Sequence, residues 1–166
     1  DAAFKTAEVT RGDETQLACA LSLLKDFDGV ICLPGTHSKW AHVSAGEVIS
    51  FQTFMTGELF ALLSAQSVLR HGMASDGWDA EAFDAGLSAA LSRPEKIAAR
   101  LFTLRAEGLL NGLTPDAARA RLSGLLIGCE LAAAKPYWLG QNVVMVGAER
   151  LTATYISALK SQGLTA

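Results

Sequence analysis

Cysteine is scarce in this sequence, and the few cysteines present do not form a recognisable site. The 166 residues include three, Cys19, Cys32 and Cys129. Their number is odd, their neighbours are apolar, and they lack the C-x-x-C spacing of metal and redox sites. We therefore expect them to be small buried side chains in the reducing environment of the cytoplasm.

An excess of positive charge and long apolar runs are also missing. Lys and Arg number 14 against 17 Asp and Glu, which gives a formal net charge of -3 at pH 7. Nucleic acids and anionic membrane surfaces attract basic proteins, so neither is an expected partner. No apolar run approaches the roughly 20 residues that span a membrane. With 50% hydrophobic residues, the chain can bury the core of one domain over residues 1–166.

Several common catalytic and metal-binding motifs do not occur. His37, His42 and His71 have no metal-ligand spacing and H-E-x-x-H is absent, so we assign no metal ligands. Ser38 lacks the G-x-S-x-G surroundings of an esterase nucleophile. The P-loop pattern and the dinucleotide-binding pattern G-x-G-x-x-G are missing as well. Zinc hydrolases, serine esterases, P-loop ATPases and Rossmann dehydrogenases are therefore excluded at the level of pattern.

Hydrophobic periodicity and turn signals predict an α/β domain. Residues 29–33 (GVICL) are a short apolar run before Pro34, which is typical of a strand buried on both faces. The alternating segments 39–44 and 47–54 flank Ala45-Gly46, which can form a hairpin turn. The other expected elements are a helix from near Asp13 to Lys25, helices over 56–69, 78–91, 94–107 and 114–134, a strand over 142–146, and a closing helix after Gly147.

Two glycine-containing turns follow the predicted buried strands. They are 33–38 (LPGTHS) and 146–148 (VGA). Backbone N–H groups in such turns can approach phosphate oxygens, because glycine leaves no side chain in the way, and Thr36 and Ser38 add hydroxyl donors. Without further context, such a segment is more often an ordinary turn.

The segment 11–16 (RGDETQ) places an arginine and two carboxylates at a predicted helix start. A carboxylate fixed there could accept the proton of a substrate hydroxyl, and Arg11 could contact an anionic substrate. The alternative is a plain helix start with acidic residues in its first turn, which the helix dipole favours.

The order of these features resembles the C-terminal domain of sugar kinases in the actin-like ATPase superfamily. Gly12-Asp13 at a helix start, the turn Gly35-Thr36, and the later strand ending at Gly147 match that superfamily's pattern. Three stretches are closer still to one of its families, the 2-dehydro-3-deoxygalactonokinases. They are 11–16 (RGDETQ), 33–40 (LPGTHSKW) and 55–63 (MTGELFALL), so the resemblance spans almost the whole chain.

This resemblance implies a fold and an activity. The fold would be a ribonuclease H-like domain with a mixed sheet and flanking helices, the C-terminal half of a two-domain kinase. The kinase would use ATP and Mg2+ to phosphorylate 2-dehydro-3-deoxy-D-galactonate on its terminal hydroxyl, giving the 6-phosphate in galactonate breakdown. The superfamily's N-terminal domain, with its own phosphate turn, has no counterpart in residues 1–166, so this chain alone is expected to be inactive.

Carried over position by position, the resemblance also assigns site residues. Asp13 would be the catalytic base, although the family more often has glutamate there, which leaves Glu14 as the alternative. Arg11, Glu14 and Lys39 are candidate contacts to the sugar acid. Ala148 stands where the superfamily usually has a second glycine. The expected nucleotide-binding residues are Gly35, Thr36, His37 and Ser38 around the phosphates, and Gly147 and Ala148 beside the nucleoside.

Two other functions remain open from the sequence. The domain could be a non-catalytic nucleotide- or sugar-binding module of the same fold. It could also belong to a kinase for another deoxy sugar acid, because the choice between galacto and gluco configuration rests on the resemblance alone. A homo-oligomer is likewise left open.

Overall fold

The computed structural model describes residues 13–24 and 27–164, except for the side chains of residues 13, 14 and 16. Arg11 and Gly12 lie outside the described residues. Helices, strands and two short 3-10 helices follow one another in the predicted order. They are α1 (Asp13–Leu23), β1 (Gly29–Leu33), β2 (Ser38–Ser44), β3 (Glu47–Phe54), α2 (Thr56–Ala65), η1 (Val68–Gly72), α3 (Ala80–Ser92), η2 (Pro94–Lys96), α4 (Ile97–Leu110), α5 (Pro115–Ala133), α6 (Lys135–Trp138), β4 (Val143–Met145) and α7 (Glu149–Lys160).

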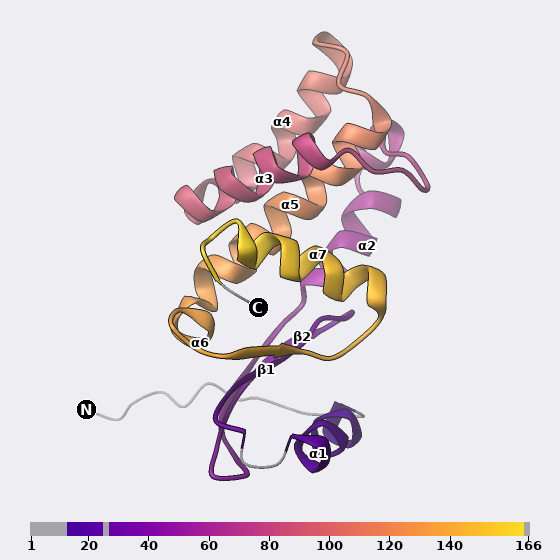
Figure 1. The fold of residues 1–166 in the computed structure, drawn as a ribbon. Helices are drawn as coiled ribbons and strands as arrows, with labels where there is room; N and C mark the ends of the chain where they lie inside the picture. The colour runs from indigo at the N-terminus through magenta and orange to yellow at the C-terminus, as the bar shows by residue number, and fades with distance from the viewer. Residues whose placement is uncertain (1–12, 25–26, 165–166) are drawn as a thin grey trace, which may run out of the picture.

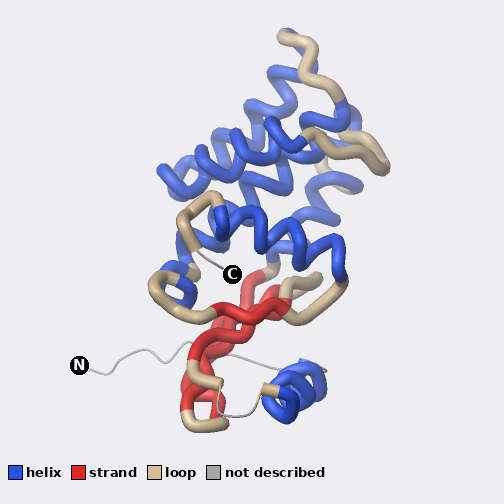
Figure 2. The backbone as a smooth tube through the Cα atoms, in the orientation of Figure 1, coloured by secondary structure: helices blue, strands red, loops and turns tan. Residues whose placement is uncertain are grey.

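The four strands form one mixed sheet in the order β3-β2-β1-β4 (Figure 2). Neighbouring strands β1 and β2, and β2 and β3, pair antiparallel, whereas β4 pairs parallel with β1. The hairpin turn at Ala45 and Gly46 has φ angles of 52° and 79°, as the favoured two-residue hairpin turns require. The predicted α/β class and mixed sheet with flanking helices are therefore confirmed.

Each face of the sheet is covered by helices (Figure 1). On one face Ile31, Leu33 and Val43 pack with apolar side chains of α1. On the other face Val30 and Trp40 join a larger core formed with α5, α6 and α7. The central strand β1 is short and apolar because both of its faces are buried.

A second core lies among the helices beyond the sheet. Leu104 of α4 and Leu122 and Leu125 of α5 belong to it, and α3 packs along α5. Gly124 permits this close packing, because a Cβ atom there would lie 2.1 Å from the carbonyl oxygen of Phe83. The helical block thus forms a layer with its own apolar interior.

Gly124→Ala is expected to destabilise the protein by about 1–3 kcal/mol, because the added methyl group would force α3 and α5 apart. Gly108→Ala is the matched control: Gly108 is an exposed position of α4 with no atom within 4 Å of an added Cβ. There, alanine should stabilise the helix slightly. Urea unfolding of both variants measures the difference; equal stabilities would contradict the role given to Gly124.

Some sequence predictions need correction. The helix predicted over 56–69 ends at Ala65, because the Ser67 hydroxyl accepts a hydrogen bond from Leu69 N–H and starts the 3-10 turn η1. The prediction that all three cysteines are buried is confirmed for Cys32 only, because Cys129 is partly buried and Cys19 is exposed. Leu17 packs towards the sheet and Ala20 is buried there, so the intervening Cys19 points away from that face of α1.

Candidate functional site

The two predicted glycine turns lie together at one edge of the sheet. Because β1 and β4 are parallel neighbours, the chain leaves both strands at the same edge. Val146 N–H donates to the carbonyl oxygen of Cys32 at 2.9 Å. A Cβ atom at Gly147 would lie 3.2 Å from the carbonyl oxygen of Pro34, so the second turn is in contact with the first. The sequence-based expectation that these segments belong to one site is thus compatible with the geometry.

The first turn of α2 packs directly on the turn after β1. Glu58 N–H donates to the carbonyl oxygen of Thr36 at 2.9 Å. Gly57 makes this approach possible, because a Cβ atom there would lie 2.3 Å from the Gly35 carbonyl oxygen. His37 Nε2 lies 2.5 Å from Glu58 Oε2, an exposed pair that adds little stability. The turn is therefore held by backbone contacts more than by side chains.

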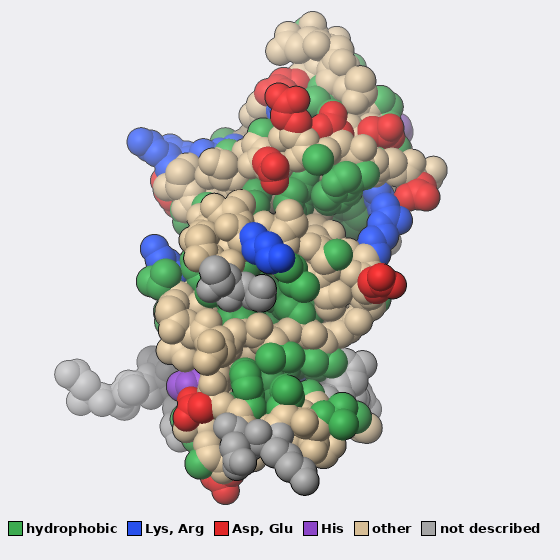
Figure 3. All heavy atoms as spheres, in the orientation of Figure 1, with side chains coloured by type: hydrophobic (Ala, Val, Ile, Leu, Met, Phe, Trp, Pro, Cys, Tyr) green, Lys and Arg blue, Asp and Glu red, His purple; other side chains and the backbone are tan. Residues whose placement is uncertain are grey.

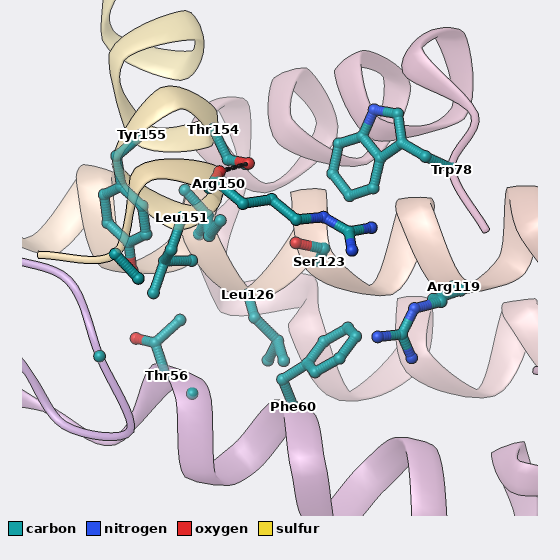
Figure 4. A pocket seen from close by; sticks show the side chains of 14 residues that line it. Thr56, Phe60, Trp78, Arg119, Ser123, Leu126, Arg150, Leu151, Thr154 and Tyr155 are labelled. Carbon is teal, nitrogen blue, oxygen red and sulfur yellow. Dashed lines mark hydrogen bonds between the residues drawn. The ribbon is translucent and has the colours of Figure 1, made fainter. Parts of the chain in front are cut away.

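A pocket of about 330 Å³ opens beside these turns (Figure 4). This volume is in the range of small-molecule binding sites, which begins at about 300 Å³. Gly35 from the first turn and Ala148 from the second both line the pocket, and α2, α5 and α7 supply the other walls. The pocket is also lined by Trp78, which precedes α3, and the residues on the helical walls include Thr56, Phe60, Arg119, Arg150 and Tyr155.

Aromatic rings and guanidinium groups face one another across the pocket. The Arg119 guanidinium carbon lies 4.9 Å from the centre of the Phe60 ring, a cation–π contact. The Arg150 side chain reaches into the same space and ends near Trp78 (Figure 4); both of its terminal nitrogens lie 3.3 Å from Asp76 Oδ1. Flat apolar surfaces and positive charge together suit a ligand that has an aromatic ring and anionic groups.

Behind the pocket wall lies a buried group of hydrogen-bonded side chains, which we call the polar cluster: Ser38, Trp40, Thr56, Glu130 and Tyr155. Glu130 accepts hydrogen bonds from Trp40 Nε1 and from the Tyr155 hydroxyl, each at 2.8 Å. Ser38 Oγ lies 3.0 Å from the same hydroxyl. The cluster joins β2, α2, α5 and α7 at the back of the pocket.

Burial shifts the titration of two members of the polar cluster. It raises the pKa of Glu130 above its ordinary value, although hydrogen bonds from Thr56, Trp40, Tyr155 and Ser38 oppose this by stabilising the carboxylate. Burial, together with the neighbouring Glu130 charge, holds the pKa of the Tyr155 hydroxyl well above its usual range. Tyr155 therefore keeps its proton and acts as a donor.

The structure places the predicted site residues in different surroundings. Gly35 and Ala148 line the pocket, and Thr36 and His37 are exposed on the turn. Ser38 is completely buried, with its hydroxyl on Tyr155. The assignment of these residues to a nucleotide stays a prediction.

Lys39 lies apart from the pocket. Successive strand residues point to opposite faces, so Lys39 is on the α1 side, whereas Trp40 faces α5. Its side chain is buried, and its Nζ donates to Thr53 Oγ1 at 3.0 Å. Asp13 begins α1, but the side chains of Asp13 and Glu14 lie outside what the structure describes.

Sequence reasoning missed several pocket residues. Trp78 was not assigned to a site from the sequence, yet it is 44% exposed and lines the pocket. Arg150 follows the second glycine turn at a helix start, which is a signal that could have found it. Phe60 and Arg119 of the pocket gave no such signal, nor did Glu130 behind its wall, because their positions depend on how α2 and α5 pack.

The described residues contain no group of three or more His, Cys, Asp or Glu side chains that could hold a metal ion. Within the same residues, each helix is too short or too polar to cross a membrane. On the face shown in Figure 3, Lys and Arg side chains are separated by acidic and uncharged ones.

Comparison with known proteins settles the family. The sequence pattern of the family described as 2-keto-3-deoxy-galactonokinase matches residues 1–166. This chain belongs to that family. The resemblance seen in the three sequence stretches is therefore confirmed.

Members of the 2-keto-3-deoxy-galactonokinase family match along nearly all of this chain. A Rhizobium meliloti (strain 1021) protein named a probable 2-dehydro-3-deoxygalactonokinase is 42% identical over 165 residues, which are 95% of this chain and 53% of that protein. The 2-dehydro-3-deoxygalactonokinase of Escherichia coli (strain K12) is 38% identical over 156 residues, 93% of this chain and 52% of that protein. The chain thus spans about half the length of these relatives.

A solved structure gives the same result. The crystal structure of a Sinorhizobium meliloti protein titled as a 2-dehydro-3-deoxygalactonokinase superposes with a TM-score of 0.89 at 39% identity. The match covers 99% of this chain and 56% of the other. The fold described above is therefore the fold of half of a protein of this family.

Proposed function

We propose that the full-length protein transfers the γ-phosphoryl group of ATP to the terminal hydroxyl of 2-dehydro-3-deoxy-D-galactonate. The products would be ADP and the 6-phosphate of the sugar acid. Membership of the family supports this proposal, and so do the names of the relatives. The single structural observation that supports it best is the pocket in which Gly35 and Ala148 meet beside Arg119 and Arg150.

We also assign the domain to the ribonuclease H-like class of the actin-like ATPases. The strand order supports this assignment, with three consecutive antiparallel strands and a fourth that pairs parallel with the first. Residues 1–166 would be the single C-terminal domain of the kinase. Because the relatives are about twice as long, the proposal includes an N-terminal domain that completes the sugar-acid site.

In this proposal each of the two turns contacts a different part of the nucleotide. Backbone N–H groups of Gly35 and Thr36 face the phosphates, and Ala148 borders the nucleoside. Arg119 and Arg150 supply positive charge to the same pocket, which favours a polyanion. Catalysis would consist of positioning the phosphates and offsetting their charge, as is general for phosphoryl transfer.

The chemical step needs a base and an acceptor oxygen. Asp13 would take the proton of the terminal hydroxyl as that oxygen bonds to the γ-phosphorus and the bond to ADP breaks. Magnesium neutralises phosphate charge in such reactions, but the described residues offer no cluster that could hold the ion. We therefore assign no magnesium ligand among the described residues.

The direct test is phosphorylation of 2-dehydro-3-deoxy-D-galactonate by the full-length protein with ATP. 2-Dehydro-3-deoxy-D-gluconate serves as the competing substrate. Preferential conversion of the galactonate supports the proposal, whereas preference for the gluconate assigns a kinase for another deoxy sugar acid. If the folded protein binds ATP but shows no turnover, the kinase proposal is wrong and the domain is a nucleotide-binding module.

Trp78→Ala is expected to raise the KM for ATP about tenfold with little change in kcat, because an aromatic face that lines the same pocket as Ala148 can stack on the adenine. Steady-state kinetics of the full-length protein measures this. Phe102→Ala is the control, since Phe102 is an exposed aromatic residue of α4 that does not line the pocket. An unchanged KM in both variants would place the adenine elsewhere.

A further inference from the structure

The polar cluster connects parts of the nucleotide pocket that are far apart in sequence. Glu130 is 3% exposed and lies on α5. Its hydrogen-bond partners come from β2, α2 and α7. Two of them, Thr56 and Tyr155, line the pocket themselves. Ser38, which bonds to Tyr155, directly follows the Gly35–His37 turn.

We propose that Glu130 is a positioning residue that holds the turn after β1 against α2 and α7, and so sets the shape of the nucleotide pocket. This inference rests on the proposed function only in naming the ligand as a nucleotide. Glu130 lies behind the wall and acts through Ser38, Thr56 and Tyr155. A change at Glu130 therefore affects the pocket through β2, α2 and α7.

The chemistry of the partners explains why an acceptor is required at this position. The indole N–H of Trp40 can only donate, and the high pKa of Tyr155 keeps its hydroxyl protonated. The two carboxyl oxygens of Glu130 accept from these two groups. Each hydrogen bond of Glu130 fixes the distance and direction from α5 to the element that carries the partner. An apolar side chain would not fix the position of α5 relative to β2 in this way.

Burying a carboxylate is costly, which argues against a purely structural role. Apolar residues of similar volume often replace buried charged groups without loss of stability. The adjoining core, which includes Val30, Ile127 and Leu131, shows that apolar packing is available at this place. The Glu130 carboxylate accordingly fixes the orientation of its hydrogen-bond partners, although its burial lowers the free energy of unfolding.

Glutamine can replace the carboxylate if one hydrogen bond reverses. Its carbonyl oxygen would accept from Trp40, and its amide would donate to the Tyr155 hydroxyl. Tyr155 would then donate to Ser38, which the 3.0 Å contact allows because either oxygen can be the donor. Methionine has a similar length but only a weak acceptor, so it leaves the Trp40 N–H without a strong partner.

The experiment compares Glu130→Gln, Glu130→Met and Tyr155→Phe in the full-length protein. Leu104→Ala is the control for lost stability, since Leu104 is buried in the second core and does not line the nucleotide pocket. Amide hydrogen exchange reports on the turn directly. The informative amides are those of Glu58 and Val146, which bond to Thr36 and Cys32.

In Glu130→Met these two amides should exchange about tenfold faster than in Leu104→Ala, and kcat/KM for ATP should fall about tenfold through KM. In Glu130→Gln, the exchange rates of these amides and kcat/KM for ATP should be close to those of the unaltered protein. In Tyr155→Phe, both quantities should lie between those of Glu130→Gln and Glu130→Met. Tyr155→Phe supplies the comparison if Glu130→Met does not fold.

Equal exchange in Glu130→Met or Tyr155→Phe and in Leu104→Ala would overturn the positioning role. Exchange does not require turnover, so this result is separate from failure of the proposed function. If the unaltered protein shows no kinase activity, faster exchange at Glu58 and Val146 still supports the positioning role. Failure of Glu130→Gln to restore either property would refute the requirement for an acceptor.

Discussion

Asp13→Asn in the full-length protein is expected to lower kcat by about 10²- to 10⁴-fold, the usual contribution of a general base. The affinity for ATP should stay unchanged, because asparagine has the same size as aspartate. The residues that line the nucleotide pocket belong to other elements than α1. Asp13 is the first residue of α1, where the positive end of the helix favours an ionised carboxyl group. Rapid-quench measurement of the chemical step, together with equilibrium ATP binding, checks both parts.

Glu14→Gln is the matched control for this change. Glu14 is the neighbouring carboxylate at the same helix start, and it is the other candidate for the base. A small effect of Glu14→Gln beside a large effect of Asp13→Asn would assign the base to Asp13. The reverse pattern would assign it to Glu14, and small effects in both would remove the base from this helix.

Gly57→Ala is expected to reduce kcat/KM for ATP by about 10²-fold with the fold preserved. The new Cβ would lie 2.3 Å from the Gly35 carbonyl oxygen and 2.8 Å from the Thr36 Cα. These two backbone atoms cannot move aside by a side-chain rotation, so the turn after β1 and α2 must separate. A misplacement of about 1 Å at a positioned group can cost two orders of magnitude in rate.

Gly72→Ala serves as the comparison, because no atom lies within 4 Å of an added Cβ at that position. Steady-state kinetics of both variants and circular dichroism measure activity and fold. If Gly57→Ala keeps full activity, the contact between α2 and the turn does not position the phosphates.

The local structure of this domain could be predicted well from its sequence. Residues 29–33 and 47–54 form strands with the predicted bounds, because apolar runs and alternation directly reflect burial on two faces or one. Thr114 caps α5 through a hydrogen bond to Ala117 N–H, as its residue type indicated. Such features depend on neighbours in the sequence.

What could not be predicted depends on long-range packing. Nothing next to Glu130 in the sequence indicates that its carboxylate meets Trp40 and Tyr155. The interruption of the helical pattern after Ala65 likewise arises from a side-chain hydrogen bond that competes with the helix. The two glycine turns could be named from the sequence, but the arginines and aromatic rings of the pocket beside them depend on how α2, α5, α7 and the segment before α3 pack together.

The parallel pairing of β4 with β1 also has a consequence for how the protein is made. Ser38 and Tyr155, which bond across the back of the pocket, are 117 residues apart in sequence. A growing chain on the ribosome displays the first turn long before the second exists, and contacts over such separations form slowly. At the proposed nucleotide site, binding would require that the last strand has docked, so a nucleotide would bind the finished fold and not its precursors. By mass action, the cellular ATP supply would then help to draw newly made chains into the native state.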